Sequence, residues 1–278
     1  MMIDIGTKHV VVHISGGGQS ALCLARCLEW YGKERVTAVF ANTNTEAPDL
    51  YDFLEEIEEH FGVQIVRLNN NGMDIWDIFD KFRVISIRSA GGACKASVEL
   101  KQKPLRAYME NFDPETTAIA LGMSWMEEDR QERCIKRPGL SDFQLIFPLN
   151  EKPRLSDCGV LDELRSMGLK LPEIYQLGYP HNNCGGGCIL AGVRQWKGLL
   201  EDYPERFAYH EERERKWRDE TGHDFTVLRD FRGNKGRAKP YTLEQFRIDV
   251  ENGRTVPGDF RTGCACMTLF EESGNEDD

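Results

Sequence analysis

Residues 11–20 of the chain read Val11-Val12-His13-Ile14-Ser15-Gly16-Gly17-Gly18-Gln19-Ser20, an apolar run that breaks into a glycine-rich turn. An amphipathic helix is predicted to begin near Gln19. Glycines allow a tight turn that brings successive backbone N–H groups close to an anion, and the start of a helix adds the positive end of its dipole. The stretch therefore predicts a phosphate-binding loop between a strand and a helix. A glycine turn without a ligand is the alternative.

The spacing of this loop excludes two common nucleotide-binding fingerprints, Gly-x-x-x-x-Gly-Lys-Ser/Thr and Gly-x-Gly-x-x-Gly. It resembles the pyrophosphate-binding loop (PP-loop) of the adenine nucleotide alpha-hydrolase superfamily, written Ser-Gly-Gly-x-Asp-Ser. The resemblance implies that the residues binding an adenine nucleotide include Ser15, Gly16, Gly17, Gly18, Gln19 and Ser20. Gln19 replaces an aspartate that is associated with the metal in ATP-splitting members, and an amide is a poorer Mg²⁺ ligand than a carboxylate. Nucleotide binding is expected, whereas Mg²⁺ and ATP cleavage stay open.

Four short apolar or β-branched runs are predicted to be buried parallel strands, at residues 10–14, 36–41, 63–68 and 117–121. Helical patterns at residues 20–30 and after Pro48 separate them. This alternation indicates an α/β fold with a doubly wound parallel sheet, in which ligands bind outside the carboxyl ends of the strands.

From about residue 150 the pattern changes to helices, at residues 161–167 and 196–221, separated by segments rich in glycine, asparagine and proline. Three regions are expected. Residues 1–150 form the nucleotide-binding α/β domain, and residues 151–268 form a mainly helical part that carries cysteines and closes the site. Residues 269–278 form an acidic, disordered tail.

The chain has 278 residues, of which 35 are basic and 46 acidic, for a net charge of −11. This charge argues against a large nonspecific nucleic-acid surface, although a local basic cleft stays compatible with it. The N-terminus lacks a secretory signal and no apolar run is long enough to cross a bilayer, so a cytoplasmic protein without a membrane partner is expected. In a reducing compartment the nine cysteines are expected to be core thiols, metal ligands or catalytic groups rather than disulfides.

Polar side chains follow the second predicted strand, in the stretch Phe40-Ala41-Asn42-Thr43-Asn44-Thr45-Glu46-Ala47-Pro48. Small polar groups at this edge can form hydrogen bonds with an adenosine. The stretch resembles the second motif of the phosphoadenylyl-sulfate (PAPS) reductase family, which implies that Asn42, Asn44 and Glu46 bind the nucleotide. For Thr45 and Glu46, a helix cap is the alternative.

Three further segments extend this resemblance to most of residues 10–200: Cys94 to Leu105, Gly122 to Arg133, and Pro148-Leu149 with the helix that follows. A sulfated or phosphorylated adenosine needs several cations. The candidates are Lys95, Lys101, Lys103, Arg130, Arg133 and Arg137. The resemblance implies that Lys103, Gly122 and Arg130 bind the nucleotide and that Arg133 is catalytic. Because Met123, Ser124 and Asp129 depart from the family signature, the substrate stays open among adenylyl sulfate (APS), PAPS and ATP.

Two cysteine groups form the second strong signal. The stretch His181-Asn182-Asn183-Cys184-Gly185-Gly186-Gly187-Cys188 places two thiols around three glycines, and Gly263-Cys264-Ala265-Cys266 offers two more. Thiolates from distant loops can hold an iron–sulfur cluster or a zinc ion. The arrangement resembles that of APS reductases, which carry a [4Fe-4S] cluster. The preferred ligands are Cys94, Cys184, Cys188 and Cys264, and Cys266 is a further ligand or the catalytic nucleophile. Cys23 and Cys27 are expected to be core thiols instead.

The resemblance implies a PAPS reductase-like enzyme that binds an adenine nucleotide and performs sulfur chemistry with an electron donor. One alternative is an ATP-dependent sulfurtransferase that thiolates tRNA or DNA. Its local support is a basic loop containing Arg229, Arg232, Lys235, Arg237 and Lys239, for which a solvated loop is the simpler interpretation. Another is a nucleotide-sensing protein that has lost catalysis.

Overall fold

A computed structural model of the chain describes residues 8–85, 94–136, 140, 142–179, 182–230 and 238–254. The structure divides into two compact units, each built from two stretches of the chain. Unit 1 comprises Met1–Met73 and Glu99–Gly185, and unit 2 comprises Asp74–Val98 and Gly186–Asp278. The predicted domain boundaries at residues 150 and 268 stay predictions.

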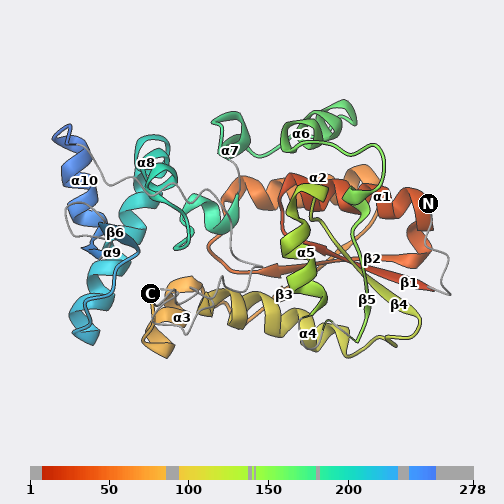
Figure 1. The fold of residues 1–278 in the computed structure, drawn as a ribbon, viewed down its shortest axis with the longest axis horizontal. Helices are drawn as coiled ribbons and strands as arrows, with labels where there is room; N and C mark the ends of the chain where they lie inside the picture. The colour runs from red at the N-terminus through yellow and green to blue at the C-terminus, as the bar shows by residue number, and fades with distance from the viewer. Residues whose placement is uncertain are drawn as a thin grey trace, which may run out of the picture. The chain divides into compact units, whose positions relative to one another are not determined.

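A five-stranded parallel sheet forms the centre of unit 1 (Figure 1). Its strands are β1 (His9–Ile14), β2 (Val36–Asn42), β3 (Ile65–Asn69), β4 (Thr117–Leu121) and β5 (Gln144–Ile146). Their order is β3-β2-β1-β4-β5, so the chain moves outward from β1 in one direction and then returns to its other side. The predicted doubly wound α/β fold is confirmed. In such sheets a ligand binds where the order reverses, which is here beside the carboxyl end of β1.

The helices of unit 1 cover both faces of this sheet (Figure 1). They are α1 (Gly18–Tyr31), α2 (Pro48–Phe61), α4 (Lys103–Met109), α5 (Glu128–Ile135), α6 (Asp157–Ser166) and α7 (Glu173–Gln176). Short helical turns lie at η1 (Lys33–Arg35), η3 (Trp125–Glu127), η4 (Pro148–Asn150) and η5 (Asn183–Gly186), and η2 (Ser97–Gln102) is a π-helical turn. Helices α1, α2 and α6 pack on one face, and α4 contacts β2 and β3.

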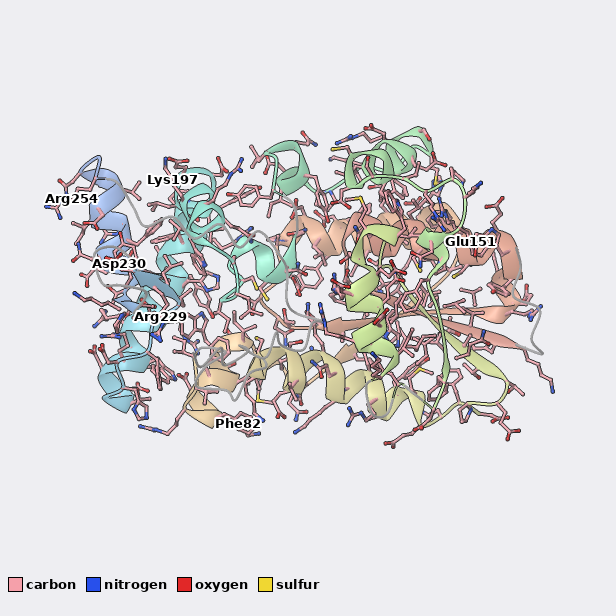
Figure 2. The ribbon with its side chains drawn as sticks, viewed as in Figure 1. Phe82, Glu151, Lys197, Arg229, Asp230 and Arg254 are labelled. Carbon is pink, nitrogen blue, oxygen red and sulfur yellow. The ribbon has the colours of Figure 1, made fainter. Side chains whose placement is uncertain are left out.

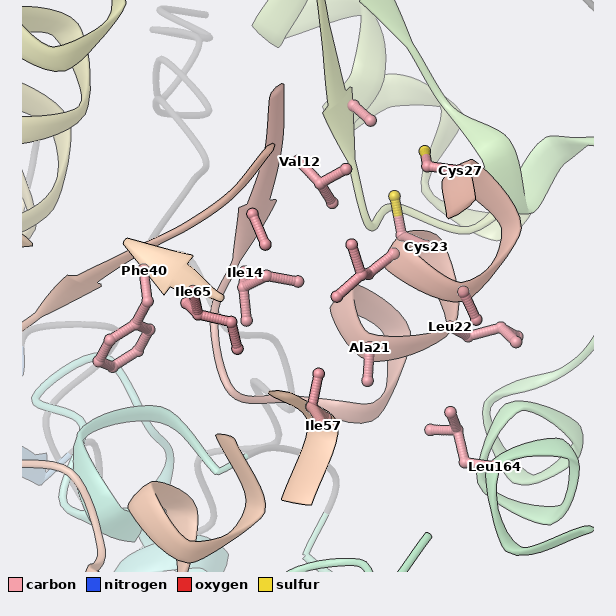
Figure 3. Close-up of a cluster of buried hydrophobic side chains, with 14 of the residues drawn as sticks. Val12, Ile14, Ala21, Leu22, Cys23, Cys27, Phe40, Ile57, Ile65 and Leu164 are labelled. Atoms are coloured by element: carbon pink, nitrogen blue, oxygen red, sulfur yellow. The ribbon is translucent and has the colours of Figure 1, made fainter. Parts of the chain in front are cut away.

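The main core lies between the sheet and the α1 face (Figure 3). Val12 and Ile14 of β1 point into it, so the side chain of His13 lies on the opposite face of the sheet. Cys23 and Cys27 of α1 are fully buried in this core, as the sequence predicts, and burial raises the pKa of the Cys23 thiol. This packing fixes the end of β1 and the start of α1, and therefore the position of the loop between them.

Unit 2 is mainly helical, as predicted for the later part of the chain. It contains α3 (Ile75–Phe82), α8 (Val193–Asp202), α9 (Pro204–Thr221), α10 (Leu243–Glu251) and a two-stranded sheet of β6 (Leu228–Asp230) and β7 (Lys239–Tyr241). The single helix expected at residues 196–221 is two helices, because Pro204 lacks an N–H and starts a new one. Charged side chains such as Lys197 and Arg254 are exposed on this unit (Figure 2).

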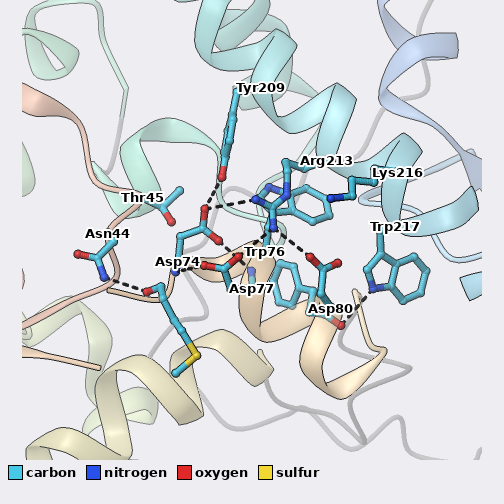
Figure 4. Close-up of polar contacts among 12 residues, drawn as sticks. Asn44, Thr45, Asp74, Trp76, Asp77, Asp80, Tyr209, Arg213, Lys216 and Trp217 are labelled. Carbon is cyan, nitrogen blue, oxygen red and sulfur yellow. Dashed lines mark hydrogen bonds and ion pairs between the residues drawn. The ribbon is translucent and has the colours of Figure 1, made fainter. Parts of the chain in front are cut away.

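Polar contacts join α3 to α9 (Figure 4). The guanidinium of Arg213 lies 3.2 Å from Asp77 and 3.0 Å from Asp80, measured to the carboxylate oxygens. The Tyr209 hydroxyl donates to Asp74. Because these groups come from both stretches of unit 2, they close it as one folded body. None of the described helices combines the length and the apolar composition that a membrane span requires.

A buried carboxylate, that of Glu214, lies in the C-terminal half of α9. The Glu214 side chain accepts the backbone N–H of Val227 at 2.7 Å and that of Leu243 at 2.6 Å. Burial nevertheless raises the pKa of Glu214 to about 7, because the charged form is poorly solvated there. Glu214 therefore holds a proton in the folded chain at pH values where an unfolded chain has lost it.

We predict that Glu214→Gln changes the pH dependence of stability. The raised pKa contributes stability that is full below about pH 4.5 and is lost as the pH rises to about 7, a change of roughly 3 kcal/mol. Urea denaturation should show that the free energy of unfolding of the wild type falls between pH 5.0 and pH 7.5 by more than that of Glu214→Gln. Glu212→Gln, on the exposed surface of the same helix, should parallel the wild type. Parallel curves for all three proteins would contradict the assignment.

Candidate functional site

The loop between β1 and α1 has the geometry of a tight anion-binding turn. Gly16 has a φ of +76°, a conformation that favours glycine. The Ser20 hydroxyl lies inside the turn, where it accepts the Ser15 backbone N–H at 3.1 Å and donates to the Gly17 carbonyl at 2.8 Å. Ser15 and Ser20 therefore fix the loop at its two ends.

Helix α1 begins without the side-chain groups that normally neutralise a helix start. Its N-cap residue is Gly17, no side chain caps the first turn, and that turn has no acidic residue. The first N–H groups of a helix have no partner within the helix and carry partial positive charge. The Tyr175 hydroxyl accepts the Gly18 N–H at 3.2 Å, which is a neutral contact. This helix start can bind an anion such as a phosphate.

Gln19 forms a contact that the loop sequence does not reveal. Its side-chain amide donates to Asp157 at 2.8 Å, and Asp157 is the first residue of α6. The substitution of the superfamily aspartate by Gln19 thus occurs together with a carboxylate that arrives from another part of unit 1. Asp157 and Tyr175 were not among the predicted site residues, because no local pattern links them to loop residues that lie 138 and 157 positions earlier.

Two glycines allow neighbouring segments to approach the loop closely. A Cβ on Gly122, directly after β4, would lie 2.7 Å from Cα and 2.8 Å from N of Ser20. A Cβ on Gly16 would lie 2.6 Å from the Leu50 side chain in α2. The start of α1 is thus packed against the end of β4, and the loop against α2. Gly122 was predicted to bind the nucleotide, and the structure gives it a packing reason to be glycine.

The segment after β2 forms a second ordered edge beside the loop. Asn44 has a positive φ of 54° and donates from its side chain to the Met73 carbonyl at 2.9 Å (Figure 4). Its backbone N–H donates to the Asn42 side chain at 2.9 Å, and the Tyr51 hydroxyl donates to the same oxygen at 2.8 Å. Asn42 and Asn44 therefore lie together at the carboxyl end of β2, next to β1 in the sheet.

Glu46 is buried rather than capping α2, whose N-cap is Ala47 without a side-chain bond. Glu46 Oε1 accepts the Thr43 hydroxyl at 2.9 Å and lies 3.3 Å from Nζ of Lys101. Its second oxygen, Oε2, is buried and has no hydrogen-bond partner among the described residues. The helix-cap alternative is therefore wrong for Glu46, which is positioned by a buried ion pair instead.

Three of the five predicted cations that the structure describes already contact a carboxylate. Lys101 pairs with Glu46, and Lys103 Nζ lies 2.8 and 2.9 Å from the two carboxylate oxygens of Glu99. Arg130 pairs with Glu127 one turn earlier in the chain. These cations are positioned, but part of their charge is neutralised before any ligand binds.

Arg133 differs from these residues. It lies on α5, is half-buried, and its Nε has no hydrogen-bond partner in the described part of the chain. Nε of Arg130 is likewise buried without a partner there. Both side chains come from the helix that follows β4, which is the neighbour of β1 in the sheet. Of the two candidate arginines that the structure describes, Arg133 has more guanidinium capacity left for an anion, because Arg130 is paired with Glu127.

The described cysteines of the predicted ligand set belong to both units. In unit 1, Cys184 is buried with a φ of +50°, and a Cβ on the next residue, Gly185, would lie 2.9 Å from the Thr45 carbonyl. The loop with Cys184 therefore packs on the edge after β2. In unit 2, Cys188 is buried and Cys94 is partly exposed.

His210 explains one glycine of this cysteine loop. A Cβ on Gly187 would lie 2.0 Å from Nε2 of His210, so only glycine fits beside this ring. The Trp76 indole donates to Nδ1 of His210 at 2.9 Å, and burial lowers the pKa of His210 to about 3. A neutral ring thus supports the backbone next to Cys188. Sequence patterns link neither His210 nor Trp76 to this loop.

Among the residues that the structure describes, no group of three or more His, Cys, Asp or Glu side chains could hold a metal ion. The predicted ligand Cys264, the predicted nucleophile Cys266 and the candidate cation Arg137 lie outside the described residues, as does His181 at the start of the cysteine stretch. So do Arg232, Lys235 and Arg237 of the basic loop and the acidic tail. The described thiols alone do not form a complete ligand set, and the cluster stays a prediction.

Two curated proteins resemble the chain in sequence. Argininosuccinate synthase of Xylella fastidiosa is 28% identical over 207 residues, which cover 69% of this chain and 49% of the synthase. The uncharacterized protein MJ0066 of Methanocaldococcus jannaschii is 29% identical over 115 residues, which cover 40% of this chain and 22% of that protein. The chain thus spans about half or less of the relatives it matches. No family model matches it.

Two solved structures resemble the chain in fold. PAPS reductase from Candida auris, a phosphate complex, gives a TM-score of 0.46 at 14% identity and covers 62% of this chain and 78% of that chain. NH3-dependent NAD synthetase from Campylobacter jejuni gives 0.40 at 15% identity, covering 73% and 79%. Argininosuccinate synthase is a PP-loop protein, so the predicted resemblance to this superfamily is confirmed. The five-stranded parallel sheet with helices on both faces is the α/β architecture that this resemblance predicts.

We predict that Gly122→Ala destabilises the chain by roughly 1–3 kcal/mol, the usual cost of overpacking. The new methyl group meets the backbone of Ser20, which cannot move without shifting α1. Urea denaturation followed by circular dichroism measures the loss.

Gly159→Ala is the matched control. Its Cβ would meet the side chains of Leu155 and Ser156, at 3.3 and 3.5 Å, and no backbone atom among its three nearest neighbours, and alanine favours the helix α6 in which it lies. This variant should be neutral or more stable. Equal stability of the two variants would contradict the close approach of Gly122 to α1.

Proposed function

We propose that the chain binds an adenine nucleotide with its phosphates on the loop of residues 15–20. The observation that carries this proposal is the uncapped start of α1 at the carboxyl edge of a parallel sheet, beside the point where the strand order reverses. The ordered edge after β2, with Asn42 and Asn44, supplies amide donors and acceptors for an adenosine. The resemblance to PP-loop proteins supports the same ligand.

The reaction that we propose is a PAPS reductase-like sulfur transfer from an adenylated sulfate. A cysteine thiolate attacks the sulfate sulfur, and the bond between that sulfur and the bridging phosphate oxygen breaks. AMP leaves with the electron pair, and the cysteine keeps a thiosulfonate. A second thiol, from a dithiol electron donor, then attacks the cysteine sulfur and releases sulfite with formation of a disulfide. Cys266 is the proposed nucleophile.

Arg133 and Gln19 support this reaction over ATP cleavage. A guanidinium with free hydrogen-bonding capacity can neutralise the charge of a sulfate or phosphate that leaves or reacts. Gln19 presents an amide where ATP-splitting members carry a carboxylate for the metal. Transfer from an adenylyl sulfate needs no carboxylate-bound Mg²⁺ at this position.

The proposed cofactor is a [4Fe-4S] cluster held by Cys94, Cys184, Cys188 and Cys264, with zinc as the alternative. Anaerobic purification followed by iron, sulfide and zinc analysis tests it. A brown protein with about four irons per chain is expected for the cluster, and one zinc without sulfide for the alternative. Cys184→Ser should abolish the metal content, whereas Cys158→Ser, at an exposed cysteine, should leave it unchanged. A metal-free wild type would contradict both assignments.

We predict sulfite formation from APS or PAPS by anaerobically purified protein supplied with a dithiol donor. Arg133→Ala should lower kcat/KM by roughly 10- to 100-fold, the value of a charge-assisted contact. Arg165→Ala, at an exposed ion pair of α6, should retain the wild-type rate. The absence of sulfite from both substrates would contradict the reductase reaction.

An ATP-dependent sulfurtransferase that thiolates tRNA or DNA is the second candidate, and one observation favours it. Asp157 brings a carboxylate to Gln19, so the loop has an acidic neighbour despite its substitution. The same protein incubated with ATP, Mg²⁺ and nucleic acid discriminates the two reactions, because only this candidate releases pyrophosphate. Tight nucleotide binding without either product would identify a non-catalytic binding protein.

A further inference from the structure

We infer that Glu46 receives the 2′- and 3′-hydroxyls of the ribose of the bound nucleotide, and that the site therefore selects adenine nucleotides in which neither of these hydroxyls is phosphorylated. The inference rests on the proposed function, because it assumes that an adenine nucleotide occupies the loop of residues 15–20. It adds a hydrogen-bond acceptor for the ribose to that site. It also separates two classes of substrate, nucleotides with a free 3′-hydroxyl and nucleotides with a 3′-phosphate.

The first observation is that Glu46 is only half-partnered. Oε1 is held by the Thr43 hydroxyl and the Lys101 ammonium, at 2.9 and 3.3 Å. The Glu46 side chain is only 1% exposed, and Oε2 is buried. Oε2 nevertheless accepts no hydrogen bond from a described residue. A buried carboxylate oxygen without a donor is costly, and such atoms are rare in folded proteins. A donor from a ligand would complete it.

The second observation is where Glu46 lies. It follows the end of β2 by four residues, and β2 is hydrogen-bonded to β1, whose carboxyl end leads into the phosphate-binding loop. The close approach of Gly16 to Leu50 joins that loop to the start of α2, two residues after Glu46. In the Rossmann dinucleotide-binding fold, a carboxylate beyond the first strand and helix binds the ribose hydroxyls while the pyrophosphate lies on the loop after the first strand, and Glu46 lies at the analogous edge of this sheet.

The third observation is the charge around this edge. Lys101 is engaged by Glu46, and Lys103 is engaged by both oxygens of Glu99. A phosphate on the ribose would meet the Glu46 carboxylate, and binding such a phosphate ordinarily requires a cation such as arginine at that position. The arrangement fits neutral hydroxyl donors and disfavours an added dianion.

Calorimetric titration of the folded wild-type chain with AMP and with adenosine 3′,5′-bisphosphate tests the inference without any substitution. AMP should bind at least about tenfold more tightly, an amount typical of one charged contact. 3′-Deoxy-AMP should bind more weakly than AMP by a similar factor, because it lacks one of the proposed donors.

Glu46→Gln removes the charge but keeps the size of the side chain and an oxygen for Thr43. The preference for AMP over the bisphosphate should shrink severalfold in this variant, while Glu59→Gln, on the exposed face of α2, should keep the wild-type preference. A thermal melt reports whether Glu46→Gln is folded, and if it is not, the wild-type titrations decide alone.

Equal or tighter binding of the bisphosphate by the wild type would overturn the role of Glu46 while leaving the nucleotide site intact. An unchanged preference in folded Glu46→Gln would overturn it as well. If neither AMP nor ATP binds, the proposed function itself fails. The experiment therefore distinguishes the failure of the inference from the failure of the function on which it rests.

Discussion

The uncapped start of helix α1 is the feature on which the rest of the site depends. Its first-turn amides carry partial positive charge at the edge of the sheet; the turn itself has no acidic residue, and the Tyr175 hydroxyl that accepts the Gly18 N–H is neutral. The core around Ile14 and Cys23 holds the strand before the loop and the helix after it. The contact of Gly122 with Ser20 fixes the same helix start from the neighbouring strand. The partially charged amides at the start of α1 are thus held in place by packing on both sides.

The carboxylates around this positive helix start shape what it can accept. Glu46, Glu99 and Glu127 each engage one of the predicted cations, so the site is less basic than a count of its lysines and arginines indicates. Arg133 keeps a buried Nε without a described partner. A site of this kind suits a ligand with a few well-placed anionic groups. The site suits a ligand with many phosphates less well, because each further phosphate would meet cations that are already paired with carboxylates.

Much of the fold could be predicted from the sequence, because buried parallel strands are short apolar runs and their alternation with helices indicates a doubly wound parallel sheet. The runs at β1, β2 and β4 are of this kind, and the glycine-rich loop marks its own position by its spacing. The strand β5 has only three residues and was not predicted. The break before α9 was missed although Pro204 signals it, because the charged pattern continues on both sides.

The contacts within the site were less predictable, for a physical reason. Asp157, Tyr175 and Lys101 reach the loop or Glu46 through tertiary packing across 55 to 157 residues, and single-chain periodicity contains no such pairing. The burial of Glu46 likewise depends on Thr43 and Lys101 together. His210 beside Gly187 is a further case, since a lone histidine in a charged helix gives no sign of its neighbour.

The central claim is that the loop amides of residues 16–20 bind the phosphates of an adenine nucleotide. The most direct measurement is an NMR titration of the chain labelled with ¹⁵N-glycine, in which ADP is added and the assigned amide resonances are followed. The account predicts that Gly16, Gly17 and Gly18 shift together and saturate with one equivalent, while Gly62 and Gly222, at the ends of α2 and α9, do not move. Saturating nucleotide binding that leaves the three loop glycines unchanged would contradict it.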